Sequence, residues 1–146
     1  MEELLNLIKE ADNFYALDGV EPFRVEEAEN ELRLSFADDY KAYVLTFGAA
    51  TFDGHELTGV CKSDRLSVVA ATERAREFFP QFPGGLYVIE DLQFDYILIV
   101  QDAEGVVYSY GPDDQAKKIA VSLQEYLFPE SINQETPEGD NPDMVL

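Results

Sequence analysis

Three short segments in the second half of the chain constrain the fold most strongly, because each has the composition of a β-strand and each closely follows the last. The segments are Leu86 to Glu90, Tyr96 to Gln101 and Val106 to Tyr110. All three are rich in β-branched and aromatic residues and are bounded by Asp or Gly, as strands between turns are. Connections this short join antiparallel neighbours, so the segments predict consecutive antiparallel strands, with Asp102 to Gly105 as a hairpin turn.

Helical patterns lie on both sides of these strand-like segments. Apolar residues recur there at steps of three and four, which is the spacing of one helix face. Ser35 precedes Asp38 by the spacing of a capping box, so we expect the third helix to start there and to end at Gly48. The segments with helical spacing are Glu2 to Ala11, Val25 to Leu32, Tyr40 to Phe47, Val68 to Phe79 and Ala116 to Phe128.

These elements together predict the α+β class: a single domain in which a central, mainly antiparallel β-sheet is packed by several α-helices. We assign this domain to residues 1–129. Residues 130–146 are rich in Pro, Asn and acid and contain no Lys or Arg, so an acidic C-terminal tail is predicted. Phe52 to Val60 is expected to form a strand or hairpin, and Asn13 to Phe23 a connecting loop.

Acidic side chains outnumber basic ones by 30 to 10, which gives a formal net charge of -20. The hydrophobic fraction of 46% is ordinary for a globular protein, so the acid is expected on a folded body. Nucleic acids and anionic membranes need clustered Lys and Arg, and neither is predicted as a partner. A basic protein partner is predicted instead. The other interpretation is that the charge serves solubility alone.

Features of targeting are missing from the sequence. Met1 is followed by Glu2 and Glu3 rather than by basic residues, and no apolar run approaches the ~18 residues of a membrane span. Cys61 is the single cysteine, so an internal disulfide is impossible. We therefore expect a cytoplasmic protein.

Residues that carry chemistry are sparse. His55 and Cys61 are the single histidine and cysteine, and on one regular strand their Cα atoms would lie roughly 20 Å apart. A nucleophile and its base need contact, which only a bend or hairpin would provide. Asp53, His55 and Glu56 could be written as metal ligands, but a surface turn is the favoured interpretation. No catalytic residue, cofactor or metal site is predicted, and the chain is not expected to be an enzyme.

Paired carboxylates are a further candidate, because two opposed acids perform glycoside hydrolysis. Sequence does not place one pair opposite another, and such pairs arise readily by chance among thirty acids, so this interpretation is not favoured. The pairs are Asp38-Asp39, Glu90-Asp91 and Asp113-Asp114.

An acidic segment, Val25 to Leu32, precedes the helical segment Phe36 to Tyr43 and the turn at Phe47-Gly48. This order resembles the opening of the SUKH superfamily of Smi/Knr-type proteins. Glu29 matches the family's glutamate, and Asp39 and Tyr40 match its Asp-Tyr pair. Ala37 stands where the family usually has Pro, and the turn that closes the helix is Gly48-Ala49. Further matching segments are Val88 to Asp91, Asp95 to Ile97 with Asp102, Val107-Tyr108 and Ser122 to Leu127.

Membership would imply a mixed sheet packed by helices and a binding protein without catalytic residues. Bacterial members are largely immunity proteins that neutralise polymorphic toxins, often nucleases, and fungal relatives regulate cell-wall signalling. The resemblance thus implies a toxin-binding immunity protein, or alternatively a scaffold or regulator that binds another partner.

Tight binding of a protein requires buried anchors in addition to charge. We therefore nominate tyrosines that lie beside acidic residues as the partner-binding set. The alternative for each tyrosine is ordinary core packing, which is also what we expect of Tyr40 and Tyr43. The nominated residues are Glu90, Asp91, Asp95, Tyr96, Tyr108, Tyr110, Asp113 and Asp114.

Overall fold

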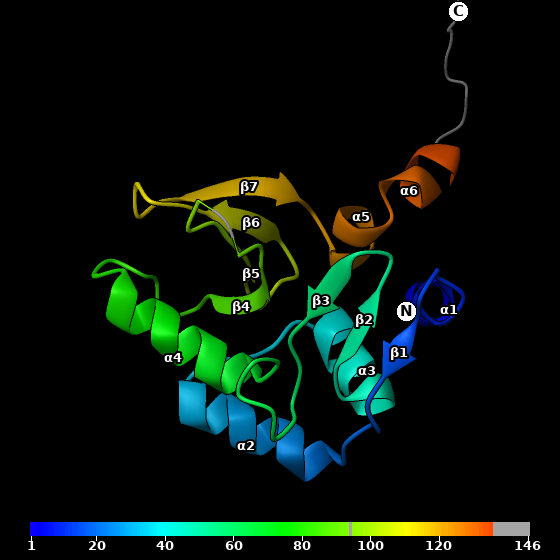
Figure 1. The fold of residues 1–146 in the computed structure, drawn as a ribbon, viewed down its shortest axis with the longest axis horizontal. Coiled ribbons are helices and arrows are strands. Elements are labelled where there is room, and N and C mark those ends of the chain that lie inside the picture. The colour runs from blue at the N-terminus through cyan, green and yellow to red at the C-terminus, as the bar shows by residue number, and fades with distance from the viewer. Residues whose placement is uncertain (94, 136–146) are drawn as a thin grey trace, which may run out of the picture.

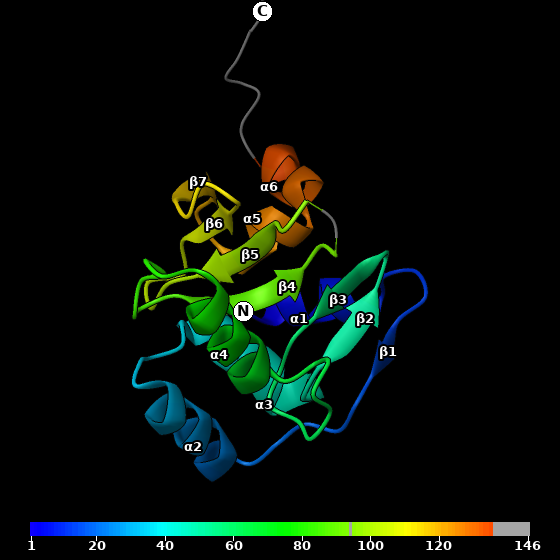
Figure 2. The same ribbon diagram turned by 60° about the vertical axis from the view of Figure 1, so that its left-hand side comes forward.

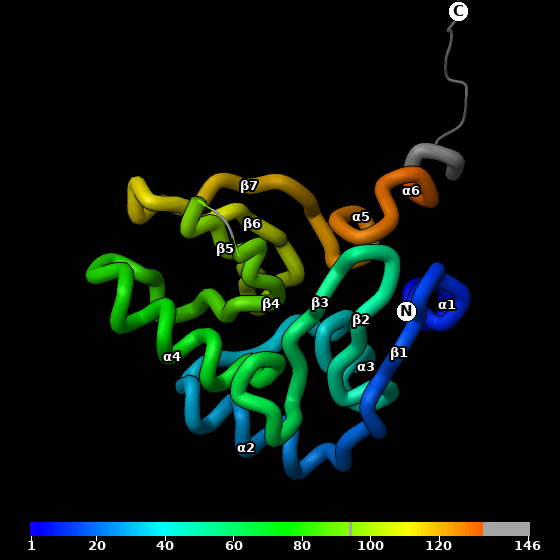
Figure 3. Tube along the Cα trace, viewed as in Figure 1, coloured from blue at the N-terminus to red at the C-terminus, as the bar shows by residue number. Residues whose placement is uncertain are grey.

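The computed structural model of the chain describes residues 1–93 and 95–135, and its elements are labelled in Figure 1 and its path is traced in Figure 3. Its helices are α1 (Glu2–Lys9), α2 (Pro22–Leu32), α3 (Asp38–Phe47), α4 (Val68–Phe78), α5 (Leu123–Leu127) and α6 (Pro129–Glu135). Its strands are β1 (Tyr15–Ala16), β2 (Ala50–Phe52), β3 (His55–Leu57), β4 (Tyr87–Asp91), β5 (Leu98–Gln101), β6 (Val107–Tyr110) and β7 (Ala116–Ala120). The predicted α+β single domain is confirmed.

The larger sheet contains β4, β5, β6 and β7 in sequence order, and each strand is antiparallel to the next. The three strand-like segments of the sequence therefore pair as predicted. Asp102 closes the turn between β5 and β6, because its Oδ1 accepts from the backbone nitrogens of Glu104 and Val106 at 2.9 and 3.1 Å. Gly105 has a φ of 99°, which favours glycine at this position.

A second, smaller sheet is present in addition to the predicted antiparallel sheet. It has the order β1-β2-β3, again antiparallel. The β2–β3 hairpin expected in this region turns at Asp53 and Gly54, whose φ values of 50° and 83° suit a tight hairpin turn. The predicted loop from Asn13 to Phe23 is partly wrong, because it supplies β1 and the first turn of α2, where Pro22 takes a favoured position.

The predicted helix from Ala116 to Phe128 is wrong in its first half, which forms the edge strand β7. The apolar residues do not alternate there, and Ala120 is buried while Ile119 is 46% exposed, so the backbone pairing with β6 rather than the side-chain pattern holds this strand. Helix α5 begins only after Ser122, whose Oγ accepts from the nitrogen of Glu125 at 3.1 Å. The Glu125 carboxylate accepts from the nitrogen of Val121 at 2.7 Å, so this pair stops the helix from extending toward β7.

The corner between α2 and α3 is closed by Glu29 rather than by Ser35. The N-cap of α3 is Ala37, which makes no side-chain cap, so the predicted capping box of Ser35 and Asp38 is wrong. Instead the Glu29 carboxylate accepts from the nitrogen of Phe36 at 2.8 Å. Arg33 adopts a left-handed conformation with a φ of 59° and ends α2.

The core lies on both faces of the larger sheet, because successive residues of β4 alternate between them. Tyr87 and Ile89 belong to the main cluster with α1, α2, α3 and the smaller sheet. Val88 faces a second cluster beneath α4, with Ala71 and Ala75. Helix α4 lies beside β4 in Figure 2 and packs on this strand of the sheet.

Helix α6 takes up the start of the predicted tail, and residues 136–146 lie outside the described residues. Within the described part of the chain, no helix has both the length and the apolar character needed to cross a bilayer.

Asp39 gives a direct test of how α3 is attached to the sheet. Its carboxylate accepts from Gln101 Nε2 at 3.1 Å and from the nitrogen of Leu123 at 3.0 Å. Asp39→Asn places an amide donor against these donors, so we expect the free energy of unfolding to fall by about 2 kcal/mol. Urea denaturation measures the loss. Asp38→Asn is the matched control, because Asp38 is exposed on the same helical turn, and an equal loss in both variants would contradict the attachment.

Candidate protein-binding surface

An open hollow of about 820 Å³ lies between α4 and the hairpin of β4 and β5. We call it the α4 hollow. Its base is apolar and is formed by Ala71, Ala75, Val88 and Leu98. The other described residues that line it are Arg74, Glu77, Phe78, Phe79, Asp91, Gln93, Asp95 and Tyr96.

Two aromatic rings stand exposed at this hollow. Phe78 at the end of α4 is 61% exposed and Tyr96 before β5 is 70% exposed. Their rings are stacked, with centroids 5.6 Å apart and planes inclined by 14°. Exposed large apolar side chains that contact each other mark a surface suited to binding more strongly than isolated ones do.

The backbone holds Tyr96 in an uncommon conformation. Asp95 and Tyr96 each have a φ of 56°, in the left-handed region that bulky residues rarely adopt. The nitrogen of Leu92 donates to the carbonyl of Ile97 at 3.2 Å and closes the hairpin around them. The hairpin thereby fixes the position of the ring that stacks on Phe78.

Charge at the α4 hollow is mainly negative. Among the described lining residues, Glu77, Asp91 and Asp95 are acidic and Arg74 is basic. Asp91 also shapes the hairpin, because its Oδ1 accepts from the nitrogen of Gln93 at 2.8 Å. Carboxylates thus border an apolar base and two exposed rings.

The structure brings three of the nominated residues together at this hollow, namely Asp91, Asp95 and Tyr96. Phe78 was not among the nominated residues, because it lies in Val68 to Phe79, a segment whose apolar residues were expected on one helix face. The helix ends at Phe78, and the extended backbone of Phe79 turns its ring inward, where it is 5% exposed. The adjacent pair of phenylalanines followed by Pro80 was the signal that one ring would be left outside.

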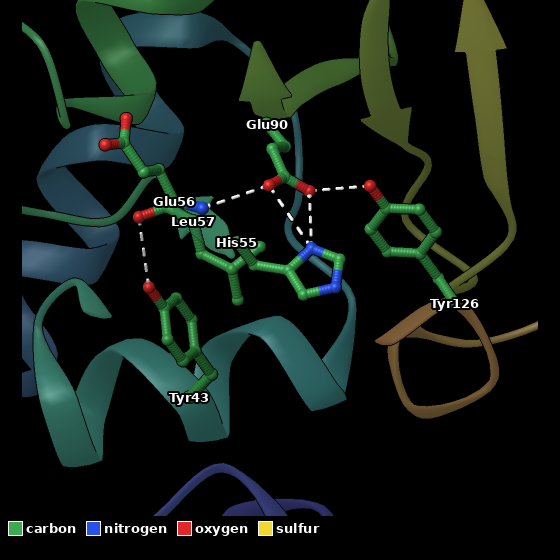
Figure 4. Close-up of polar contacts among 6 residues, drawn as sticks. All are labelled: Tyr43, His55, Glu56, Leu57, Glu90 and Tyr126. Carbon is green, nitrogen blue, oxygen red and sulfur yellow. Dashed lines mark hydrogen bonds and ion pairs between the residues drawn. The ribbon is translucent and has the colours of Figure 1, made fainter. Parts of the chain in front are cut away.

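Glu90 is not available to a partner, which corrects its nomination. It is 4% exposed, and its carboxylate is held from three sides, as Figure 4 shows. The nitrogen of Glu56 donates to Oε2 at 3.0 Å, and the hydroxyl of Tyr126 donates to Oε1 at 2.6 Å. His55 Nδ1 lies 3.1 Å from Oε1. The carboxylate therefore joins β3, β4 and α5.

Electrostatics at this cluster favour a charged His55. The hydrogen bond with Glu90 raises the pKa of His55, and burial opposes that shift. Burial raises the pKa of the Tyr126 hydroxyl well above its usual range, and Glu90 adds to the shift. The described residues contain no group of three or more His, Cys, Asp or Glu that could hold a metal ion.

Cys61 lies apart from this cluster. Burial raises the pKa of its thiol, and its Sγ lies 3.9 Å from the carbonyl of Ser63.

The remaining nominated residues lie on and beside β6, apart from the lining of the α4 hollow. Tyr110 is 1% exposed and donates to the carbonyl and carboxylate of Asp114, which removes it from the candidate surface. Tyr108 is partly buried and donates to Asp102 Oδ2 at 2.9 Å. Asp113 is exposed and lies 3.3 Å from Lys117 Nζ.

Comparison with known families decides the classification. The family model described as SMI1-KNR4 cell-wall, SUKH_5, matches residues 1–130. The chain belongs to the SUKH superfamily. The SUKH fold is also found in a solved structure titled "Crystal structure of protein from Pseudomonas syringae pv. tomato", which superposes with a TM-score of 0.69 at 16% identity. That match covers 86% of this chain and 96% of the other. No curated protein matches the chain.

The SUKH motif residues of this chain are structural. Glu29 closes the α2–α3 corner and lies 3.7 Å from Lys41 Nζ. Asp39 ties α3 to β5 and α5. Tyr40 is fully buried, and its hydroxyl lies 3.0 Å from Thr58 Oγ1. The α4 hollow takes Asp91, Asp95 and Tyr96 from matching segments and Phe78 from outside them.

The raised pKa of His55 predicts a pH dependence of stability. A group whose folded pKa is raised contributes stability that is fully present below its unfolded pKa of about 6.5 and is lost as pH rises through the folded pKa. We expect the stability difference between the wild type and His55→Gln to shrink as pH rises from about 5.5 to about 8.5. Urea denaturation across this range measures it. A difference that stays constant with pH would refute the role of Glu90 in holding the charged imidazole.

The left-handed backbone of Tyr96 predicts an unusual order of stabilities. Glycine adopts this conformation without the Cβ penalty, so Tyr96→Gly should be about 1 kcal/mol more stable than Tyr96→Ala. Thermal and urea unfolding measure the difference. The matched control is the same pair at Tyr15 on β1, where glycine in a strand should be less stable than alanine. The same sign at both positions would count against a strained Tyr96.

Proposed function

We propose that this chain is a non-catalytic protein-binding module that acts as an immunity protein in the cytoplasm. It binds and neutralises a cognate polymorphic toxin, for which a nuclease is the first candidate class. The observation that carries the proposal is the α4 hollow, where exposed Phe78 and Tyr96 lie among carboxylates. Membership of the SUKH superfamily agrees with a binding role.

Charge gives this function a physical basis. Nucleases carry basic surfaces that hold phosphates, and a chain of net charge -20 attracts such surfaces over long distances. Steering of this kind raises association rates by ~10–10³-fold and weakens with salt, whose screening length is about 8 Å at physiological strength. The same charge disfavours nucleic acids and anionic membranes as partners.

Charge alone does not give the tight binding that neutralisation of an enzyme needs. An interface of about 1,600 Å² reaches high affinity through a few buried anchors near its centre, among which aromatic residues are enriched. Phe78 and Tyr96 are exposed in the free chain and can become such anchors on binding. The apolar base of the hollow adds surface that a partner would remove from water.

Co-expression with the protein encoded beside this chain tests the function. We expect that protein to stop growth when expressed alone and the wild-type chain to restore growth, because binding blocks the toxin's active site or its access to substrate. The Phe78→Ala, Tyr96→Ala double variant should protect at least tenfold less well, as loss of two anchors costs at least about 1.4 kcal/mol. Survival on induction plates measures protection.

The matched control is Phe23→Ala, Tyr15→Ala, which removes two aromatic rings that are 51% and 66% exposed on α2 and β1. This control should protect as the wild type does. A toxic neighbour that the wild-type chain leaves active would refute the immunity function. In that case, recovery of only signalling proteins in a pull-down from the native organism would favour a regulatory SUKH protein.

A further inference from the structure

We infer that the α4 hollow recognises an arginine-bearing basic segment of the partner protein, in preference to a lysine-bearing or purely apolar one. This inference rests on the proposed function, because it names the chemistry by which that partner is bound. Three features of the hollow support it in turn: its apolar base, its exposed ring pair and its carboxylates.

The apolar base suits the stem of a long side chain. Ala71, Ala75, Val88 and Leu98 present small or aliphatic groups from α4, β4 and β5. Long cationic side chains bury their methylene stems on such surfaces while the charged end stays at a polar edge. The base therefore suits the long stems of arginine and lysine.

The ring pair favours binding of arginine over binding of lysine. Phe78 and Tyr96 stack on each other, and their exposure of 61% and 70% leaves ring surface open at the hollow. A guanidinium is planar and weakly hydrated, so it stacks on an aromatic face more favourably than a hydrated ammonium does. The chain already contains one such contact, because the guanidinium of Arg24 lies 5.0 Å from the ring centroid of Phe23.

The carboxylates favour a cationic side chain of the partner over an apolar one. Glu77, Asp91 and Asp95 outnumber Arg74 among the described lining residues. An apolar plug would cover the rings but would leave these carboxylates partly desolvated without a partner, which is costly. A guanidinium offers several donors in a planar fork and pairs with carboxylates in two-point geometry. Charge and shape together thus favour arginine.

Titration with synthetic peptides, followed by the amide signals of the full chain in NMR, tests this recognition. The probes are a short acetylated and amidated peptide with two arginines, the same peptide with two lysines, and its uncharged leucine counterpart. We expect the arginine peptide to bind about threefold tighter than the lysine peptide. Its shifts should be confined to the residues that line the α4 hollow.

Two pairs of variants control this experiment. Tyr96→Ala should abolish the preference for arginine, whereas Tyr15→Ala should keep it. Asp91→Asn with Asp95→Asn should weaken both charged peptides, and Asp91→Asn retains the oxygen that accepts from Gln93. Glu26→Gln with Glu31→Gln removes the same charge from the exposed side of α2. This pair should weaken binding of the charged peptides less, because neither residue lines the α4 hollow.

Several outcomes would overturn the inference. Equal affinities for arginine and lysine, shifts spread over the whole acidic surface, no binding at all, or tighter binding of the leucine peptide each contradict it. The two proposals fail separately. Growth protection that survives Tyr96→Ala together with an equal response to all peptides would leave the immunity function intact and remove the role of the hollow. Arginine-selective binding at the hollow without protection would do the reverse.

Discussion

A buried chain of hydrogen bonds fixes how α3 meets the larger sheet, and it holds the side of the domain on which the main core lies. The nitrogen of Ala37 donates to the Tyr87 hydroxyl at 2.9 Å, and that hydroxyl donates to Gln101 Oε1 at 2.7 Å. Gln101 is fully buried, and its Nε2 donates to Asp39 Oδ1 and to the carbonyl of Gly105. Because buried polar groups are costly when unpaired, this network allows one register between α3, β4 and β5.

In that register the two faces of β4 have different roles. Tyr87 points toward α3 and Glu90 toward β3 and α5, so residues of this strand hold the frame together. Val88 points the other way and forms part of the base of the α4 hollow. Glu29, Asp39 and Tyr40 of the superfamily motif also hold the frame, while Phe78 and Tyr96 stand exposed at the hollow. Phe78 and Tyr96 can therefore change without loss of these frame contacts.

The sequence predicts local pattern well and the choice between burial and exposure poorly. The strand-like segments and their short turns predicted three strands of the larger sheet, β4, β5 and β6, since turn chemistry and strand propensity act locally. The helical spacing of Ala116 to Ile119 gave no sign of a strand, because β7 is held by backbone pairing with β6, which the side-chain pattern does not record. Glu90 and Tyr110 looked like surface residues because their donors and acceptors come from residues distant in sequence or from a turn. Asp91, Asp95 and Tyr96 line one hollow because the short β4–β5 hairpin keeps them close, as neighbours in sequence.

The scarcity of cations ties stability to binding. Ten basic residues cannot neutralise thirty acidic ones, and some of the basic residues make contacts that hold the fold together. Arg76 donates to the carbonyls of Leu32 and Gly84 at 2.8 and 3.1 Å, and Lys41 faces Glu29. Unmatched negative charge opposes the compact state by self-repulsion. A basic partner would reduce this repulsion in addition to making its own contacts, so the acid that weakens the free chain would stabilise the complex.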